Sequence, residues 1–123
     1  MEMELNEIPE VSGVKMSAML KFIVAEVVCG KEKRLVVRAD LFVRKSSEDE
    51  RDLSHDDILN ALYEELKDVG KPKMLGGGWL YVGEDRIVIH SDSYEYGIEP
   101  DRQATADMLR RAFPERKIEI ETS

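Results

Sequence analysis

The chain is poor in cysteine, in histidine and in long hydrophobic runs: its 123 residues include one Cys and two His. Cys29, the single thiol, cannot form an internal disulfide and belongs to no metal-binding Cys/His motif, so we predict a core residue. No stretch approaches the ~18 consecutive apolar residues of a membrane span, and the acidic start MEMELNEIPE lacks the order of charges of a signal peptide. We therefore expect a cytoplasmic protein.

The chain also has fewer basic than acidic residues: 18 Lys and Arg against 26 Asp and Glu give a net charge of −8. Binding to nucleic acid or to an anionic membrane depends on a positive surface, so neither is an expected partner. An anionic ligand must be held by local groups. Charged residues make up 36% of the chain while Asn and Gln are scarce, a composition typical of a thermophile's surface.

The length predicts a single domain, residues 1–123, with one core. We find no repeat and no linker. The one break in composition is RKSSEDERDLS at residues 44–54, which we predict to be an exposed loop.

Two β-branched runs, residues 20–28 and 33–43, flank Gly30 and predict an antiparallel strand pair. After the loop, Ser54 and the acidic residues that follow it form a capping-box-like helix start, with apolar residues at helical spacing until Gly70-Lys71-Pro72. WLYV and RIVIH, joined by residues 83–85, predict a hairpin.

A second helix is predicted from about Pro100, with that proline in its first turn, to Phe113-Pro114, and KIEIE at 117–121 alternates as a final strand. These elements predict an α+β fold, in which a mainly antiparallel or mixed sheet of about five to six strands is packed by two helices.

The segment LGGGWLYVGEDRIVIHSDSYEYG, residues 75–97, holds the strongest local signal. Gly76, Gly77 and Gly78 allow positive φ angles and close approach of another group, so we predict a turn and a backbone contact, with direct ligand contact as the alternative. His90 is expected to be a half-exposed sheet residue rather than a second catalytic base. Trp79 is expected in the core or at its rim.

An ordered set of residues resembles the Janus/Ocnus family, which includes a small protein-histidine phosphatase, that is, a phosphohistidine phosphatase. The set comprises Lys21 in a strand, His55 at a helix start, LGGG at 75–78, Ser93 three residues before Tyr96-Gly97, and a late helix ending in Phe113-Pro114. It covers roughly residues 8–121, with gaps in the 44–54 loop and after Gly97.

The resemblance implies a hydrolase in which His55 is the catalytic histidine and Lys21 helps to hold the phosphate. It also implies that backbone amides complete the phosphate site, at the helix start around Asp56 and in the segment from Ser93 to Glu95. Loop contacts from Gly76, Gly77, Gly78 and Trp79 are further candidates. No metal and no cofactor is expected.

Elementary chemistry is compatible with this assignment. A helix N-terminus presents unpaired N–H groups and the positive end of the helix dipole, so it can hold a phosphate oxygen without a basic patch. A histidine there can act as nucleophile or as general base. Lys21 would neutralise charge on the transferred group if it points into the same cleft.

Three positions depart from the family pattern. Trp79 stands where an Arg usually follows the glycines, Asp56 follows the histidine in place of a small residue, and Glu95 replaces an Ala. A carboxylate facing a phosphate matters, because like charges 4 Å apart repel by ~4 kcal/mol at an effective dielectric of ~20.

Three functions therefore stay open. The first is a metal-independent phosphohistidine-phosphatase-like hydrolase. The second is a module that binds phosphate or another anion without turnover. The third is an oligomeric scaffold or an enzyme acting on a different small molecule, because a fold does not determine a reaction. The expected ligand is a phosphorylated protein or a small anionic substrate.

Overall fold

The computed structural model describes residues 5–14, 18–41, 55–67, 69–93 and 96–121. The predicted 44–54 loop, the predicted cap Ser54 and the candidate Glu95 lie outside these residues. Within them, no helix is long and apolar enough to cross a membrane.

A mixed six-stranded sheet forms the centre of the fold, in the order β1-β3-β2-β4-β5-β6. The pairs at its two edges, β1 with β3 and β5 with β6, are parallel, and the three inner pairs are antiparallel. The predicted α+β class is confirmed. The elements in chain order are η1 (Leu5–Glu7), β1 (Val11–Ser12), β2 (Ala18–Cys29), β3 (Glu32–Leu41), α1 (His55–Leu66), β4 (Lys71–Val82), β5 (Arg86–His90), α2 (Arg102–Ala112) and β6 (Lys117–Ile120).

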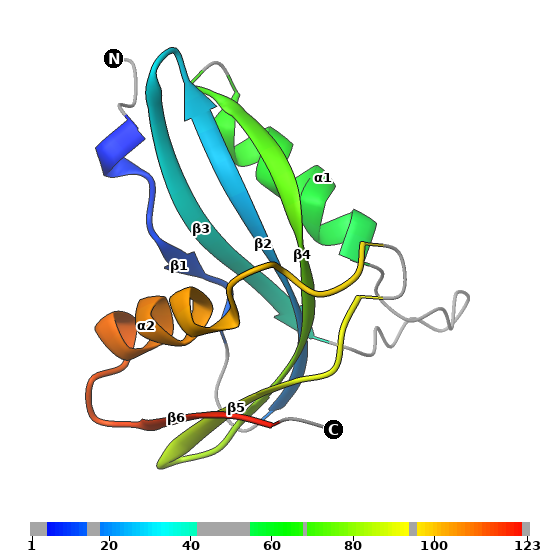
Figure 1. The fold of residues 1–123 in the computed structure, drawn as a ribbon, viewed down its shortest axis with the longest axis vertical. Coiled ribbons are helices and arrows are strands. Elements are labelled where there is room, and N and C mark those ends of the chain that lie inside the picture. The colour runs from blue at the N-terminus through cyan, green and yellow to red at the C-terminus, as the bar shows by residue number, and fades with distance from the viewer. Residues whose placement is uncertain (1–4, 15–17, 42–54, 68, 94–95, 122–123) are drawn as a thin grey trace.

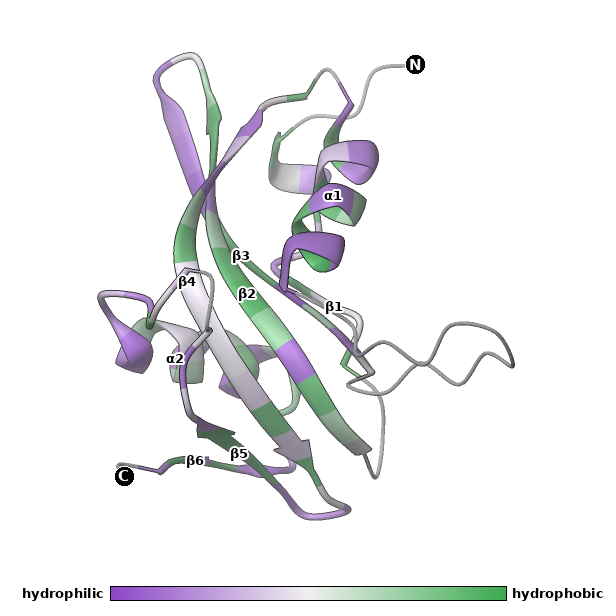
Figure 2. Ribbon diagram, turned by 90° about the vertical axis from the view of Figure 1, so that its right-hand side faces the viewer, coloured by the Kyte–Doolittle hydropathy of each residue, from purple (hydrophilic) through white to green (hydrophobic). Residues whose placement is uncertain are grey.

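The two helices cover opposite faces of the sheet (Figures 1 and 2). Alternation along β2 explains this arrangement, because successive side chains of a strand point to opposite faces. Ile23 packs in the core beneath α1 with Ile58 and Leu62. Phe22 packs in the other core, beneath α2, with Leu109. Each helix presents an apolar stripe to its own face of the sheet, so the described residues form two cores, and the prediction of one core is wrong.

The hairpin of β2 and β3 confirms the predicted antiparallel pair, with Gly30 in its turn at φ +61°. Cys29 is exposed, so the prediction of a core thiol is wrong. The apolar run that suggested burial ends with β2 at this residue, directly before the turn, where neither helix covers the sheet.

Helix α2 starts slightly later than predicted. Asp101 is its N-cap, with the side chain accepting a hydrogen bond from the Ala104 amide at 3.2 Å. Pro100 therefore precedes the cap and is not in the first turn. This cap provides one of the acceptors that the first amides of a helix require.

Strand β4 is the main departure from the expected elements. It begins at Lys71 and runs through Pro72 and all three glycines to Val82. Gly76, Gly77 and Gly78 thus lie in the middle of a strand at the centre of the sheet, and the predicted turn is wrong at this place.

Candidate functional site

His55 is the first residue of α1 and is only 3% exposed. Its Nε2 lies 3.0 Å from the carbonyl oxygen of Gly78 in β4. A carbonyl oxygen only accepts, so Nε2 must carry the proton, and in the neutral ring the lone pair is then on Nδ1. This hydrogen bond fixes the imidazole, and with it the start of α1, to the strand that carries the glycines.

A row of polar and aromatic side chains crosses the sheet beside this contact. Lys21 in β2 is in register with Asp40 on one side and Trp79 on the other, and Trp79 is in register with His90. Lys21 lies two residues before Ile23 and so faces the same side of the sheet as α1. Strand pairing therefore places the predicted phosphate-binding lysine next to the residue that follows Gly78.

Trp79 is the centre of this row. The Nζ of Lys21 lies 5.6 Å from the Trp79 ring centroid, and the His90 ring lies 6.3 Å from it at an interplanar angle of 40°. The first distance is within the range of a cation–π interaction. The aromatic ring at the position where a cation was expected thus holds the lysine of the neighbouring strand.

The segment that follows β5 joins the glycines through its backbone. The Ser93 amide donates to the Gly77 carbonyl at 3.1 Å, and the Gly77 amide donates to the Gly97 carbonyl at 3.0 Å. Ser93 itself is buried, and its hydroxyl oxygen accepts from the Tyr96 amide at 3.1 Å. That bond uses one of the two lone pairs of the oxygen, and the hydroxyl proton is the group that Ser93 can donate.

Asp56, the residue after the candidate histidine, is exposed and bonds to the same segment. Its Oδ1 accepts a hydrogen bond from the Tyr96 hydroxyl at 2.6 Å. The carboxylate that appeared unfavourable for anion binding is therefore engaged by a donor. This contact and the bonds of Ser93 bring together the helix start, the glycines, Tyr96 and Gly97.

The three glycines are required by close backbone packing. A Cβ on Gly76, whose φ is +146°, would collide with the backbone of Ile98 and Glu99, and a Cβ on Gly77 would collide with the Phe22 carbonyl. A Cβ on Gly78 would lie 2.7 Å from the His90 carbonyl oxygen. The close approach expected from the sequence is present, and it is made by other parts of the chain.

Arg102 is a cation near the glycines that the sequence analysis did not identify. It donates to the carbonyls of Ser91, at 2.6 Å, and Gly77, at 3.1 Å. It also pairs with buried Glu99 at 2.8 Å, and Glu99 accepts from the Thr105 hydroxyl at 2.7 Å. No local pattern marks this network, because its members meet only when α2 packs on the sheet.

Ser91 shows that this network is under conformational constraint. Its φ is +61°, which is uncommon for a residue with a side chain. The bond from Arg102 to its carbonyl holds the chain at the point where it leaves β5. The guanidinium therefore supports the candidate site from the α2 side of the sheet, and it donates four hydrogen bonds to acceptors among the described residues.

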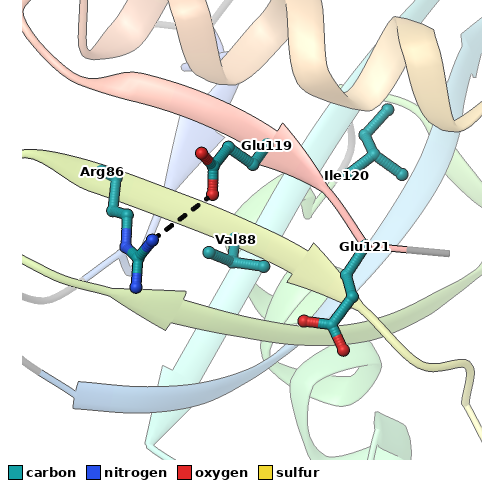
Figure 3. A pocket seen from close by; sticks show the side chains of 5 residues that line it. All are labelled: Arg86, Val88, Glu119, Ile120 and Glu121. Carbon is teal, nitrogen blue, oxygen red and sulfur yellow. Dashed lines mark ion pairs between the residues drawn. The ribbon is translucent and has the colours of Figure 1, made fainter. Parts of the chain in front are cut away.

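No cluster of three or more His, Cys, Asp or Glu side chains suited to a metal ion occurs among the described residues. An open hollow of about 530 Å³ lies elsewhere, on β5 and β6, and is lined by Arg86, Val88, Glu119, Ile120 and Glu121 (Figure 3). Arg86 is already paired there with Glu119 at 3.7 Å. Two carboxylates make this hollow unsuitable for a phosphate, so we do not assign it to the candidate site.

The described candidate residues thus fall into two groups. His55, Asp56, Ser93 and the glycines are joined by hydrogen bonds, and Lys21 lies beside them through its contact with Trp79. This arrangement places an imidazole with a defined tautomer, a helix N-terminus and an ammonium at one end of the sheet. Such groups can orient an anion and exchange a proton with it.

Comparison with known proteins supports the family resemblance seen in the sequence. No curated protein matches the chain in sequence. The sequence profile of the Janus/Ocnus family (Ocnus) matches residues 5–117, which include β1 to β5, both helices and every described candidate residue. The chain therefore belongs to the Janus/Ocnus family.

Proposed function

We propose that the protein is a phosphohistidine-phosphatase-like hydrolase in which His55 carries the reaction. The observation that supports this most directly is the fixed imidazole at the start of α1, with Nε2 bonded to Gly78 at 3.0 Å. A catalytic histidine requires a defined tautomer, and this bond assigns the proton. Membership of the Janus/Ocnus family supports the same reaction class.

The proposed reaction breaks the P–N bond of phosphohistidine and forms a P–O bond to water. In one route, Nδ1 of His55 takes a proton from the attacking water, and the proton then passes to the leaving imidazole. In the other, Nδ1 forms a bond to phosphorus while the substrate P–N bond breaks and the leaving imidazole takes a proton from solvent; water then attacks phosphorus, breaks the P–Nδ1 bond and returns its proton to solvent. Both routes use the same nitrogen, so both depend on the Nε2 contact.

The surrounding groups would act on the phosphoryl charge. The first amides of α1 point toward a ligand at the helix start, where the dipole favours an anion by ~0.3–1 kcal/mol at an exposed position. Lys21 would offset the charge that remains on the phosphoryl oxygens. Because its ammonium lies over Trp79, the ring would limit its movement and hold it in place.

The decisive comparison is between His55→Gln and His55→Ala. The Gln side chain can still donate to the Gly78 carbonyl, but it offers no basic nitrogen. We expect release of inorganic phosphate from a phosphohistidine substrate to fall by at least ~100-fold in both variants. Only the Ala variant should also lose stability, by ~1–3 kcal/mol, because a buried carbonyl then lacks its donor.

The assays should be run without added metal and again with Mg²⁺, with thermal unfolding of each variant as a check on folding. His90→Gln is the matched control, because it makes the same change in the other histidine, which bonds to Ser91. Full activity in His55→Gln would contradict the proposal. An intact-mass measurement at alkaline pH would separate the routes, because only the second forms a phosphorylated enzyme.

A module that binds phosphate without turnover is the second candidate. It is favoured by the burial of His55, which is 3% exposed. It is also favoured by Trp79, which stands where the family pattern has an Arg and which contacts Lys21 through its ring. Calorimetric titration with inorganic phosphate and with a phosphorylated peptide tests it. Saturable binding with no phosphate release, lost on Lys21→Gln, would favour this function over hydrolysis.

A further inference from the structure

The far end of α1 carries an unusual concentration of positive charge. Residues 29–34 and 67–73 together contain six of the 18 Lys and Arg residues but two of the 26 Asp and Glu residues. The rest of the chain is therefore even more acidic than the net charge of −8 implies. This end is separated from His55 by the 12 residues of α1, about 18 Å along the helix axis.

The fold brings the two basic segments together. Lys33 in β3 is in register with Val28 in β2, and Val28 is in register with Lys71 in β4. The turn between β2 and β3 lies at the same end of the molecule as the end of α1 and the start of β4, away from α2 (Figure 1). Strand pairing thus places Lys33 and Lys71 in one row across the sheet, on the same face.

This surface contains an open hollow of about 600 Å³, which we call the lysine hollow. Its apolar part is formed by Val28, Val69 and Pro72, and its cations are Lys67, Lys71 and Lys73. The remaining lining residues are Cys29, Gly30 and Gly70. It therefore offers both apolar contact and positive charge.

The cations are available to an external ligand. Lys33, Lys67, Lys71 and Lys73 are all exposed, and none of them forms an ion pair within the described residues. Glu26 is in register with Lys73 but makes no ion pair with it. A surface with uncompensated lysines in an acidic protein is complementary to a negatively charged partner.

The spacing of the lysines favours an extended polypeptide. Lys71 and Lys73 are two positions apart in β4, so they point to the same face and are separated by ~6.6 Å along the strand. Acidic side chains at alternate positions of an extended peptide have the same spacing. The apolar part of the hollow would accommodate an apolar side chain of that peptide, a contact that inorganic phosphate does not make.

We propose that the lysine hollow binds an extended acidic segment of a partner protein, with carboxylates at alternate positions and an adjacent apolar residue. This binding is independent of the function proposed for His55. It would place a protein partner at the opposite end of α1 from the candidate reaction site.

The test uses a fluorescein-labelled peptide of alternating Glu with two Leu residues, and a matched peptide in which Gln replaces Glu. We expect saturable anisotropy with the first peptide, weakening as salt is raised, and none with the second. Lys71→Gln combined with Lys73→Gln should weaken binding about tenfold. Lys117→Gln, an exposed lysine in β6, is the control and should leave binding unchanged.

Cys29 supplies an independent readout, because it is the single cysteine and lines the hollow. The bound peptide should slow alkylation of Cys29 by iodoacetamide, and the Gln peptide should not. Absence of binding, equal loss in Lys117→Gln, or unchanged alkylation at saturation would each overturn the proposal. Equally strong displacement by single-stranded RNA or by anionic vesicles at matched charge would also overturn it, since the site would then select charge alone.

Discussion

The two ends of α1 are built in different ways. At the His55 end, hydrogen bonds join segments that are far apart in sequence: α1 to β4, β4 to Ser93 and Gly97, and Asp56 to Tyr96. At the Lys67 end, the exposed lysines make no ion pair within the described residues. Substitutions at the first end should therefore cost stability, whereas those at the second should change binding with little effect on folding.

The charges of the two ends are also opposite. Residues 48–57, which lead into α1, contain six Asp or Glu and one Arg, whereas residues 67–73 contain three Lys and one Asp. Acidic residues near the start of a helix and basic residues near its end both stabilise it through the helix dipole. The distribution of charge along the chain therefore favours α1 at both of its ends.

The largest stability loss is expected from Glu99→Ala at the His55 end. Its carboxylate is 1% exposed and pairs with Arg102, whose side chain is 10% exposed, so its removal leaves a largely buried guanidinium without its counter-charge. We expect a loss of ~3–5 kcal/mol, measured by urea denaturation. Asp107→Ala, which breaks an exposed pair with Arg110, is the control and should cost less than ~1 kcal/mol. Equal losses in the two variants would contradict the structural role given to the buried network.

A pair of glycine variants compares the two ends directly. Gly76→Ala should cost ~3 kcal/mol or more, because it combines a φ of +146° with a collision against the Ile98 and Glu99 backbone. Gly30 lies in the turn beside the lysine hollow, with φ +61° and no atom within 4 Å of the position that a Cβ would take. Gly30→Ala should therefore lose only ~1–2 kcal/mol of stability, the cost of the left-handed conformation. Thermal unfolding of both proteins measures the difference. A smaller loss for Gly76→Ala would show that the 98–99 segment gives way easily.

The smallest effect is expected from Tyr96→Phe, which removes the hydroxyl bonded to Asp56. The loss should be ~0.5–1.5 kcal/mol, because one hydrogen bond at an exposed carboxylate is exchanged for water. Tyr81→Phe provides the control at an exposed tyrosine, with an expected change within ~0.5 kcal/mol. Identical unfolding curves for the two variants would mean that Tyr96 does not hold the start of α1.

Much of the fold follows from local sequence pattern. The β2–β3 and β4–β5 hairpins, both helices and the final strand were predictable because apolar periodicity and turn residues act over a few positions. Cys29 was misassigned because a β-branched run predicts a strand but not how far a helix covers it. The start of α2 was predicted two residues too early, at Pro100, because Asp101 is the better N-cap.

The candidate site was predictable only in part. His55 and Ser93 stand out through an ordered set of residues along the chain. Arg102 and Glu99 do not, because their role depends on the packing of α2 against β4 and on the unusual backbone of Ser91. The three glycines suggested a turn because positive φ is common in turns, whereas the requirement here is the approach of other backbone segments.

The sequence by itself determined the order of the two helices and the five longer strands, though not the two-residue strand β1. It also determined the single thiol and the separation of acidic from basic residues along the chain. These properties depend on residue type and short-range spacing. The tertiary structure alone decided that His55 bonds to Gly78, that Lys21 lies over Trp79, and that Lys67, Lys71 and Lys73 line one hollow with the β2–β3 turn. Each of these contacts depends on strand register and helix packing, which bring together residues that no local pattern connects.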